Sequence, residues 1–466
     1  MVLLAAGLGF LAGCVHYQAR PISVETSATA LAARSLQDEG LRAYLTQNLG
    51  RAISPWPPET WDFEALSWVA FYYQPSMDVA RAQWAAACAA AKTAAVRPNP
   101  ALSVVPGYDT SVSRPTSPWF PAVNLDFLIE TARKRGYRVA IEQLNSEAAR
   151  LDVLASAWQV RSELRRALVE VEASARRSAV LEKQLALQEE LVAVVEQRRK
   201  AGAASANEVS ASRVALVRAE AAAADEARQG PLARNRVAQF LGVPLAALEG
   251  VRFENLVVRE PAAMGADEFA AARRQSLQSR ADVLAALARY EASQSALQLE
   301  VARQYPDLHL GPGYQYDLGD NKWSLGLTLE LPLFNHNQGP IAEAEARRRQ
   351  AAAQFVATQA RAIGEIDGAA GAQAAAIDRR VRLRGLEGEV HQQTARIEAR
   401  IAAGGADRMD LLDTRIEQAS AEAALLDASI AAAGAAGQLE DALQVPFHNL
   451  SAVAGSRGDG TLSRSP

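Results

Sequence analysis

The sequence predicts a mainly α-helical, elongated fold with a small β part, built as two copies of one unit of roughly 200 residues. Three observations predict it: an internal duplication, two stretches of about 60 residues without proline, and four segments in which apolar residues occupy every second position. The composition agrees, because 49% of the 466 residues are hydrophobic and only 6% are aromatic. Alanine-rich helices that pack closely give this balance.

The duplication appears in three pairs of segments that match in the same order. The pairs are residues 99–108 with 305–314, at an offset of 206 positions, and residues 198–202 with 400–404 and 241–244 with 443–446, both at an offset of 202. Three ordered matches at nearly one offset are not expected by chance. Each unit is therefore expected to contain a helix, two strands, a very long helix, a break at glycine and a shorter helix.

The first element is an apolar run from Val2 to Val15, which is too short to cross a bilayer but suits the apolar part of a signal peptide. Its last residues, Leu11-Ala12-Gly13-Cys14, resemble a bacterial lipobox, although no lysine or arginine precedes the run. The resemblance implies cleavage before Cys14 and acylation of its sulfur. A chance cysteine behind an apolar leader is the alternative. Because one acyl chain anchors weakly, a second membrane element is expected.

The predicted organisation has five parts. A mixed, polar stretch after Cys14 predicts a tether, and the glycine- and serine-rich end of the chain predicts a disordered tail. The parts are residues 1–13 as signal peptide, 14–60 as lipid-anchored N-terminal tether, 61–250 as first repeat, 251–448 as second repeat and 449–466 as tail. Each repeat is expected to open with one helix, over residues 61–96 and 270–303.

Each repeat then carries a pair of predicted strands, at about 101–130 in the first and about 307–333 in the second. The alternating apolar positions are Leu102, Val104, Pro106 and Tyr108; Val123, Leu125, Phe127 and Ile129; Leu308, Leu310, Pro312, Tyr314 and Tyr316; and Trp323, Leu325, Leu327, Leu329, Leu331 and Leu333. Strands of about ten residues with aromatic side chains near their ends suit a bilayer crossing. A soluble sheet with one face on a helical core would alternate in the same way.

The strand count has a consequence for assembly. Four strands cannot close a barrel, for which about eight are the practical minimum, so a membrane role requires several copies to share one barrel. The mean hydropathy of −0.09 excludes a polytopic helical membrane protein. A soluble protein and a β-barrel both remain open at this point.

Long helices follow the strand pairs. Residues 137–200 and 341–403 contain no proline and predict helices of roughly 60 residues, about 90 Å long at a rise of about 1.5 Å per residue. The shorter helix after each must fold back antiparallel. The result is two helical hairpins, with their tips near Gly202 and Gly404.

Several functional classes are excluded by composition and motifs. The 49 basic and 53 acidic residues give no basic field for nucleic acid. No phosphate-cradling loop or metalloprotease histidine pair is present, and the histidines His16, His309, His336, His391 and His448 are scattered. We therefore expect no enzyme activity, cofactor or metal site. Cys14 and Cys88 lie in unlike surroundings and do not predict a disulfide.

The duplicated order of elements behind a lipobox resembles the TolC family of outer-membrane efflux proteins. Two motifs carry the resemblance: Pro332-Leu333-Phe334-Asn335-His336-Asn337-Gln338-Gly339-Pro340-Ile341, which runs into Ala344-Glu345-Ala346, and a tip pattern that ends Asp410-Leu411-Leu412-Asp413. The resemblance covers the chain from about Trp61 to Pro446. The Pro-Leu-Phe-Asn segment is similar to the metal-efflux, CzcC-like branch, in which arginine is commoner at the position of His336.

The resemblance implies an outer-membrane lipoprotein that serves as the exit duct of a tripartite efflux system, passively conducting metal cations or drugs to the exterior. In this fold, three copies contribute four strands each to a 12-stranded transmembrane β-barrel on a periplasmic α-helical barrel. The implied partners are two further copies in a homotrimer, outer-membrane lipid, a periplasmic adaptor (membrane fusion) protein and an inner-membrane efflux transporter of the RND type. The alternative is a periplasmic coiled-coil adaptor or scaffold lipoprotein.

Asp410 and Asp413 are candidate pore residues. They lie three positions apart near the start of a predicted helix, so their side chains project from one face. By the resemblance, these positions match an acidic constriction at the periplasmic end, where a threefold axis would collect six carboxylates. Rings of charge in a narrow pore select permeating ions. Alternatively, acids in a first helical turn merely complement the helix dipole.

Four further residues are candidates for adaptor docking at the tips: Arg198, Gly202, Arg400 and Gly404. Each glycine follows its arginine by four positions, which fits a helix-terminating turn with a cation in the last turn. The resemblance implies that adaptor hairpins dock at these tips, with these four residues contributing. Ordinary helix capping is the alternative.

Overall fold

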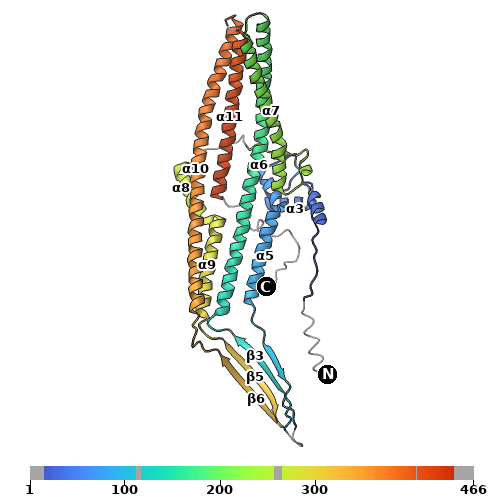
Figure 1. Cartoon of the computed structure of the whole chain (residues 1–466), viewed down its shortest axis with the longest axis vertical. Coiled ribbons are helices and arrows are strands. Elements are labelled where there is room, and N and C mark those ends of the chain that lie inside the picture. The colour runs from blue at the N-terminus through green and yellow to red at the C-terminus, as the bar shows by residue number, and fades with distance from the viewer. Residues whose placement is uncertain (1–14, 112–116, 257–264, 318, 406, 445–466) are drawn as a thin grey trace.

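In the computed structural model, the chain forms a long rod with helices along most of its length and a small sheet at one end (Figure 1). The structure describes residues 15–111, 117–256, 265–317, 319–405 and 407–444. The tips of the long helical hairpins lie at the end opposite the sheet, and shorter helices thicken the middle (Figure 1). The predicted signal peptide, Cys14 and the predicted tail lie outside the described residues.

The first repeat contains α4 (Phe63–Tyr73), α5 (Pro75–Ala95), β2 (Ala101–Val105), β3 (Ala122–Ile129), α6 (Lys134–Lys200), α7 (Ala206–Leu241) and the short 3-10 helix η1 (Leu245–Leu248). The second contains α8 (Ala266–Ser279), α9 (Ala281–Ala302), β5 (Leu308–Asp317), β6 (Asp320–Leu329), α10 (Gln338–Ala402) and α11 (Arg408–Leu443). The two long helices have 67 and 65 residues, and each return helix has 36. None of the described helices combines the length and the apolar character that a membrane span requires.

The opening helix of each repeat is broken, so the single helices predicted over residues 61–96 and 270–303 are wrong. In the first repeat, Pro75 disfavours helical backbone at the preceding Gln74, which is extended. In the second, the break falls at Arg280, whose guanidinium donates to the carbonyl oxygen of Ala442 at 2.9 Å and to Glu365 at 2.7 Å. Those contacts fix the break without proline or glycine.

The N-terminal segment also differs from the prediction. Its first helix, α2 (Val24–Ala32), has no buried residue, as a tether requires. From Arg34 onward, however, the chain is fastened to the body: the Arg34 guanidinium donates to the carbonyl oxygen of Gly242 at 2.8 Å, and Leu41 and Leu45 of α3 (Glu39–Leu49) are fully buried. The described part of the tether is therefore no longer than residues 15–33. A parallel pairing of β1 (Thr60–Trp61) with β4 (Arg252–Phe253) also joins this region to the end of the first repeat.

The main hydrophobic core lies in the middle of the rod. It gathers side chains from β1, α3, α4, α5, α6, α7, η1 and α9. Its largest fully buried members are Trp61, Phe71, Leu41, Leu45, Leu66, Met77, Leu164, Leu241 and Leu248. Farther along the rod, burial is sparse. Only eight residues of the 65-residue α10 are buried. The long helices therefore leave much of their surface without a partner in a single chain.

Four strands form one antiparallel sheet in the order β2-β3-β5-β6. Each repeat supplies one hairpin, and the pairing of β3 with β5 joins the two repeats. Two strands are shorter than predicted, since β2 ends at Val105 and β6 at Leu329. Pro106 and Pro332, which lack the N–H that a ladder needs, follow closely.

Candidate functional site

The sheet has one apolar face and a second face that carries its polar side chains, although Val105 and Leu128 also lie on that second face. Directly opposed residues of antiparallel strands share a face, and the register pairs apolar with apolar side chains, for example Val104 with Val123 and Leu310 with Leu327. On the other face, Asn124 opposes Gly313, and Gln315 opposes Lys322. The alternation seen in the sequence therefore becomes two continuous surfaces.

No described helix covers the apolar face, because the sheet projects beyond the ends of the helices (Figure 1). Trp323 is 80% exposed, Leu325 71% and Leu102 64%. The alternative of a soluble sheet packed on a helical core is therefore wrong for this chain. An exposed apolar surface of this extent marks contact with lipid or with another protein.

Aromatic side chains mark the far end of both hairpins. Tyr108 and Trp119 pack edge to face, with ring centroids 4.9 Å apart, and Tyr314 and Trp323 pack at the same separation. The two pairs occupy equivalent positions in the two repeats. Aromatic rings collect where a strand leaves the hydrocarbon for the water interface, so the pairs fit one border of a membrane-crossing sheet.

Both outer strands of the sheet, β2 and β6, have one unpaired edge within the described chain. Every residue of β2 and β6 is exposed. Unpaired edges present rows of backbone donors and acceptors that can pair with another strand. A second copy of the chain can therefore extend this sheet from either side.

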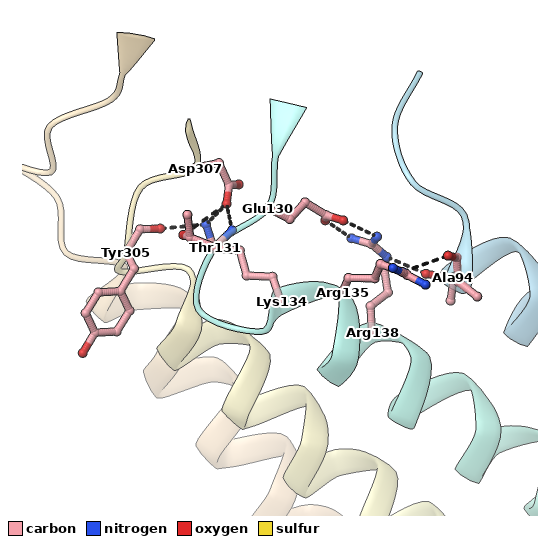
Figure 2. A network of polar contacts seen from close by, with 9 residues as sticks. Ala94, Glu130, Thr131, Lys134, Arg135, Arg138, Tyr305 and Asp307 are labelled. Carbon is pink, nitrogen blue, oxygen red and sulfur yellow. Dashed lines mark hydrogen bonds and ion pairs between the residues drawn. The ribbon is translucent and has the colours of Figure 1, made fainter. Parts of the chain in front are cut away.

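The junction between sheet and helices is held by two polar clusters (Figure 2). In the first, the Lys134 ammonium donates to the Asp307 carboxylate at 2.8 Å and to the carbonyl oxygen of Tyr305 at 2.7 Å. The Thr131 backbone N–H also donates to Asp307, at 2.8 Å. Burial acts to raise the pKa of Asp307, but the hydrogen bonds from Lys134 and Thr131 outweigh it and lower that pKa. The cluster ties β3 and α6 of the first repeat to the start of β5.

The second cluster connects the same turn to the end of α5 (Figure 2). The Arg138 guanidinium donates to both carboxylate oxygens of Glu130, at 2.6 and 3.1 Å, and to the carbonyl oxygen of Ala94 at 3.2 Å. Arg135 donates to the carbonyl oxygen of Ala95 at 2.9 Å. Hydrogen bonding to Glu130 raises the pKa of Arg138, so this pair stays charged. Polar contacts therefore stabilise three connections between helices and sheet: α5 to β2, β3 to α6, and α9 to β5.

The turn from strand to long helix is strained in the same way in both repeats. Ala132 and Arg133 before α6 have φ of 51° and 62°, and Asn337 before α10 has φ of 62°. Left-handed backbone at residues other than glycine costs about 1–2 kcal/mol each. Asn337 compensates through its side-chain amide, which donates to the carbonyl oxygen of Glu300 at 2.7 Å. The strain marks the point where the chain reverses from strand to helix.

At the opposite end, the four long helices form a row. Helix α10 packs on α11, α11 on α6, and α6 on α7, so α10 and α7 are the outer members. The two hairpins carry the same ion pair, Arg213 Nε to Glu196 at 3.0 Å in the first and Arg415 Nη2 to Glu398 at 2.9 Å in the second. Equivalent residues at an offset of 202 make this pair.

Asp410 takes part in a helix cap. Its backbone N–H donates to the Asp407 carboxylate at 2.9 Å, and its own carboxylate accepts the Asp407 N–H at 3.2 Å, which is a capping box. Ser205 and Glu208 make the same box at the first tip. Asp413 lies one turn later on α11 and is exposed. Burial and the charges of Asp410 and Asp407 raise the pKa of Asp413.

The predicted docking residues all lie at the tips, where the structure gives each a local contact. Gly202 and Gly404 have φ of 72° and 73°, which only glycine adopts without strain, and they end their helices. Arg400 donates to the carbonyl oxygen of Gly405 at 2.9 Å. Arg198 forms an ion pair with Asp407 at 3.1 Å and so links the two tips.

A second contact strengthens this link between the repeats. The Arg408 guanidinium lies 2.6 Å from the Glu190 carboxylate of α6. Both partners are exposed, so each such pair contributes about 0–1 kcal/mol. Among the described residues, the ion pairs that join the two hairpins at the tip, Arg198 with Asp407 and Arg408 with Glu190, are therefore weak.

Sequence reasoning missed the pair of His309 and Asp126 on the polar face and the pair of Lys134 and Asp307 at the junction. Their members lie 183 and 173 positions apart, and no motif links them. Among the described residues, no group of three or more histidine, cysteine or acidic side chains is placed to hold a metal ion.

The comparisons with known proteins agree with this architecture. Residues 272–443 match the family model described as "Outer membrane efflux protein". A search of the curated proteins finds no match.

Three solved structures are similar to the chain. A membrane protein from Pseudomonas aeruginosa has a TM-score of 0.67 at 22% identity, over 82% of this chain and 90% of that one. The outer membrane protein VceC from Vibrio cholerae has a TM-score of 0.67 at 21% identity, over 83% and 97%. The Campylobacter jejuni CmeC outer membrane channel has a TM-score of 0.67 at 14% identity, over 92% and 93%. The mainly helical, TolC-like fold is confirmed, and the printed names describe no enzyme.

The junction gives a prediction with a defined pH dependence. Replacing Asp307→Asn should lower the free energy of unfolding at pH 7 by about 1–3 kcal/mol, because the Lys134 ammonium, whose side chain is 10% exposed, loses its charged partner. The pKa of Asp307 is lowered in the fold, so its contribution is full above the ordinary carboxyl pKa of about 4 and disappears as the pH falls through the lowered value. Thermal unfolding in detergent at pH 7 and at about pH 3 measures both effects.

The matched control is Asp225→Asn, which removes an exposed pair with Arg228 and should change the unfolding temperature little. An Asp307→Asn protein as stable as this control at pH 7 would contradict the assigned role.

Proposed function

We propose that this chain, whose residues 272–443 match the model of the outer membrane efflux protein family, is the outer-membrane exit duct of a tripartite efflux system. It conducts solutes passively from the periplasm to the exterior. Energy for transport comes from an inner-membrane transporter of the RND type, and a periplasmic adaptor joins the two. Residues 61–250 and 251–448 are its two repeats, and residues 14–60 form the N-terminal part.

A single observation carries the proposal: a four-stranded sheet with an uncovered apolar face and two open edges. In water, such a sheet exposes apolar surface and unpaired backbone groups together, and both are unfavourable. In a bilayer, lipid covers the apolar face, and pairing between copies closes the edges. Strands β5 and β6 have 10 residues each, enough to cross when tilted.

The strand count sets the number of copies. Three copies supply twelve strands. When β2 of each copy pairs with β6 of the next, the strands close into a barrel with the polar face inward. The same threefold arrangement places α7 of one copy beside α10 of the next, so the rows of four helices close into a helical tunnel. The sparse burial on α10 supports this, since its free surface then has a partner.

The inner-membrane transporter, and not the duct, determines which solutes are exported. A wide, water-filled duct adds little selection by shape, so metal cations and drugs are both suitable cargo. The Pro332-Leu333-Phe334-Asn335 segment favours the CzcC-like, metal-efflux branch.

Asp410 and Asp413 form the acidic constriction at the periplasmic end of this duct. Their equivalents at the first tip are Glu208 and Ala211. Because Glu208 repeats the capping role of Asp410, capping explains that residue at both tips. Nothing in the cap requires Asp413, whose pKa is raised by burial and by the charges of Asp410 and Asp407. Asp413 therefore carries the larger share of ion selection.

The two glycine-ended tips, with Arg198 and Arg400, form the surface on which adaptor hairpins dock. Arg198 links the tips through Asp407, so an adaptor that competes for either side chain would loosen the closed end. Cys14, when acylated, anchors the chain to the inner leaflet beside the barrel. A periplasmic adaptor would not need the exposed apolar sheet, so this alternative is disfavoured.

The location and assembly provide the first test. After membrane fractionation and electrophoresis without heating, the full chain should appear in the outer membrane as an oligomer of three copies, labelled by radioactive palmitate. Cys14→Ser is the matched variant: it should lose the label and keep the oligomer, because strand pairing and not the lipid holds the copies together. Recovery as a monomer in the soluble periplasmic fraction would refute the duct and favour an adaptor.

The constriction is tested by ion selectivity in planar lipid bilayers. Asp413→Ala should lower the preference for K⁺ over Cl⁻ several-fold at neutral pH, as expected for the loss of one charged ring. Asp410→Ala should mainly weaken the helix cap, costing about 0.5–2 kcal/mol of stability. Glu208→Ala, the equivalent cap at the first tip, is the control and should leave selectivity unchanged. Wild-type selectivity in the Asp413→Ala pore would end the assignment.

Docking is tested by crosslinking from a photoreactive residue placed at the exposed position of Ala203. Gly202→Pro cannot adopt the positive φ of this turn and should abolish crosslinking to the adaptor, identified by mass spectrometry. Gly202→Ala is the control, because its Cβ meets no atom within 4 Å and its strain is about 1–2 kcal/mol, so the tip keeps its shape. Equal crosslinking in the proline variant would contradict docking at this tip.

A further inference from the structure

The polar face of the sheet carries a pair that neither the fold nor the duct so far explains. The Nδ1 atom of His309 on β5 lies 3.0 and 3.2 Å from the two carboxylate oxygens of Asp126 on β3. Their side chains are 44% and 48% exposed. An imidazole and a carboxylate are thus held in hydrogen-bonding contact on a surface open to solvent.

The surroundings leave this pair unobstructed. Gly311 and Gly326, which oppose each other on the same face next to the pair, add no side chain. A Cβ at Gly311 would meet only backbone oxygen atoms, at 3.5 and 3.8 Å. His309 itself is flanked across the strands by Leu128 and Thr328, and neither carries a charge.

Other charged groups on this face stand toward the two ends of the strands. At the far end, Lys322 forms an ion pair with Asp317 at 2.7 Å, and Asp320 lies at the adjoining turn. At the helix end are Asp307, two residues before His309 and paired with Lys134 at 2.8 Å, Glu130, paired with Arg138 at 2.6 Å, and Glu330 just beyond β6. On β2, Ser103 faces the same side without charge. Within the four described strands, the titratable side chains on this face are His309, near the helix end of β5, Asp126 on β3, and the Asp317, Asp320 and Lys322 group at the far end.

We propose that His309 and Asp126 form a proton-dependent charge site that sets the ion selectivity of the strand-lined part of the duct. This proposal rests on the proposed function, since the polar face is the lumen only when copies close the barrel. Imidazole is the side chain that ordinarily changes charge between about pH 5 and pH 8. With His309 protonated, the pair is neutral. With His309 neutral, the Asp126 carboxylate remains and each copy adds one negative charge.

The threefold assembly multiplies this change at one level of the lumen. Three neutral pairs become three negative charges as protons leave, while the Lys322 and Arg138 pairs stay neutral throughout. A ring of negative charge concentrates cations and repels anions in the water-filled passage. Cation preference should therefore increase with pH, through a group that lies far from the acidic tip.

The experiment measures reversal potentials of the full-length pore in planar bilayers, across a KCl gradient, at pH 5.5 and pH 8. For the wild type, the K⁺ to Cl⁻ permeability ratio should be about twofold or more higher at pH 8. His309→Gln should hold the high ratio at both pH values, because Asp126 keeps its charge. Asp126→Asn should lower the ratio at pH 8 to about the value of the wild type at pH 5.5, because the site then carries no charge. His336→Gln, an exposed histidine outside the strands, is the matched control and should behave as the wild type.

Two results would overturn the proposal: a pH effect in His309→Gln as large as in the wild type, which would assign it to Asp413 or another group, or a wild-type ratio that does not change with pH. If His309→Gln fails to assemble, Asp126→Asn decides alone, and an unchanged ratio at pH 8 would refute the site. A wild-type chain that forms no pore would instead refute the proposed function, so the two failures are distinguishable.

Discussion

The rest of the structure depends on one constraint: the four-stranded sheet is not closed within a single chain. Four strands expose an apolar face and two backbone edges, and no described helix of the same chain covers either. Hydrogen bonding along both edges and burial of the face require other copies and a non-aqueous surrounding. In the proposed assembly, the single chain is a segment of a larger closed structure. The same holds for the helix row, whose outer members α7 and α10 each have a free side.

A closed sheet and a closed ring of helices can share one axis only if the connection between them is rigid. The clusters around Asp307 and Glu130 provide this rigidity, because charged side chains join β3, α5, α6 and the start of β5. Left-handed backbone at Arg133 and Asn337 makes the reversal from strand to helix compact. At the tip, in contrast, the two hairpins are joined by exposed pairs such as Arg198 with Asp407. Partly buried charged contacts thus hold the sheet to the helices at the junction, whereas weaker, exposed ion pairs join the two hairpins at the tip.

The sequence predicts features that depend on neighbouring residues, and it does not predict features that depend on contacts between residues far apart in the chain. The absence of proline predicts the long helices, and alternation predicts the strands and their faces, because both signals are local. The break at Arg280 has no local signal, since contacts with Ala442 and Glu365 fix it. Burial of Leu41 and Leu45 likewise depends on distant partners. The site at His309 and Asp126 needs the pairing of β3 with β5, which brings together segments from different repeats.

Comparison of equivalent positions in the two repeats distinguishes residues that the fold needs from residues that serve the function. Features that recur at equivalent positions are required by the unit itself: the capping boxes, the left-handed turns before the long helices, the tip ion pairs and the Tyr-Trp contacts. Asp413 corresponds to Ala211, and His309 to Ser103. One copy of the unit therefore folds without either charge. In the proposed assembly, both residues lie on surfaces that face the lumen, so the proposed duct accounts for their presence in a single repeat.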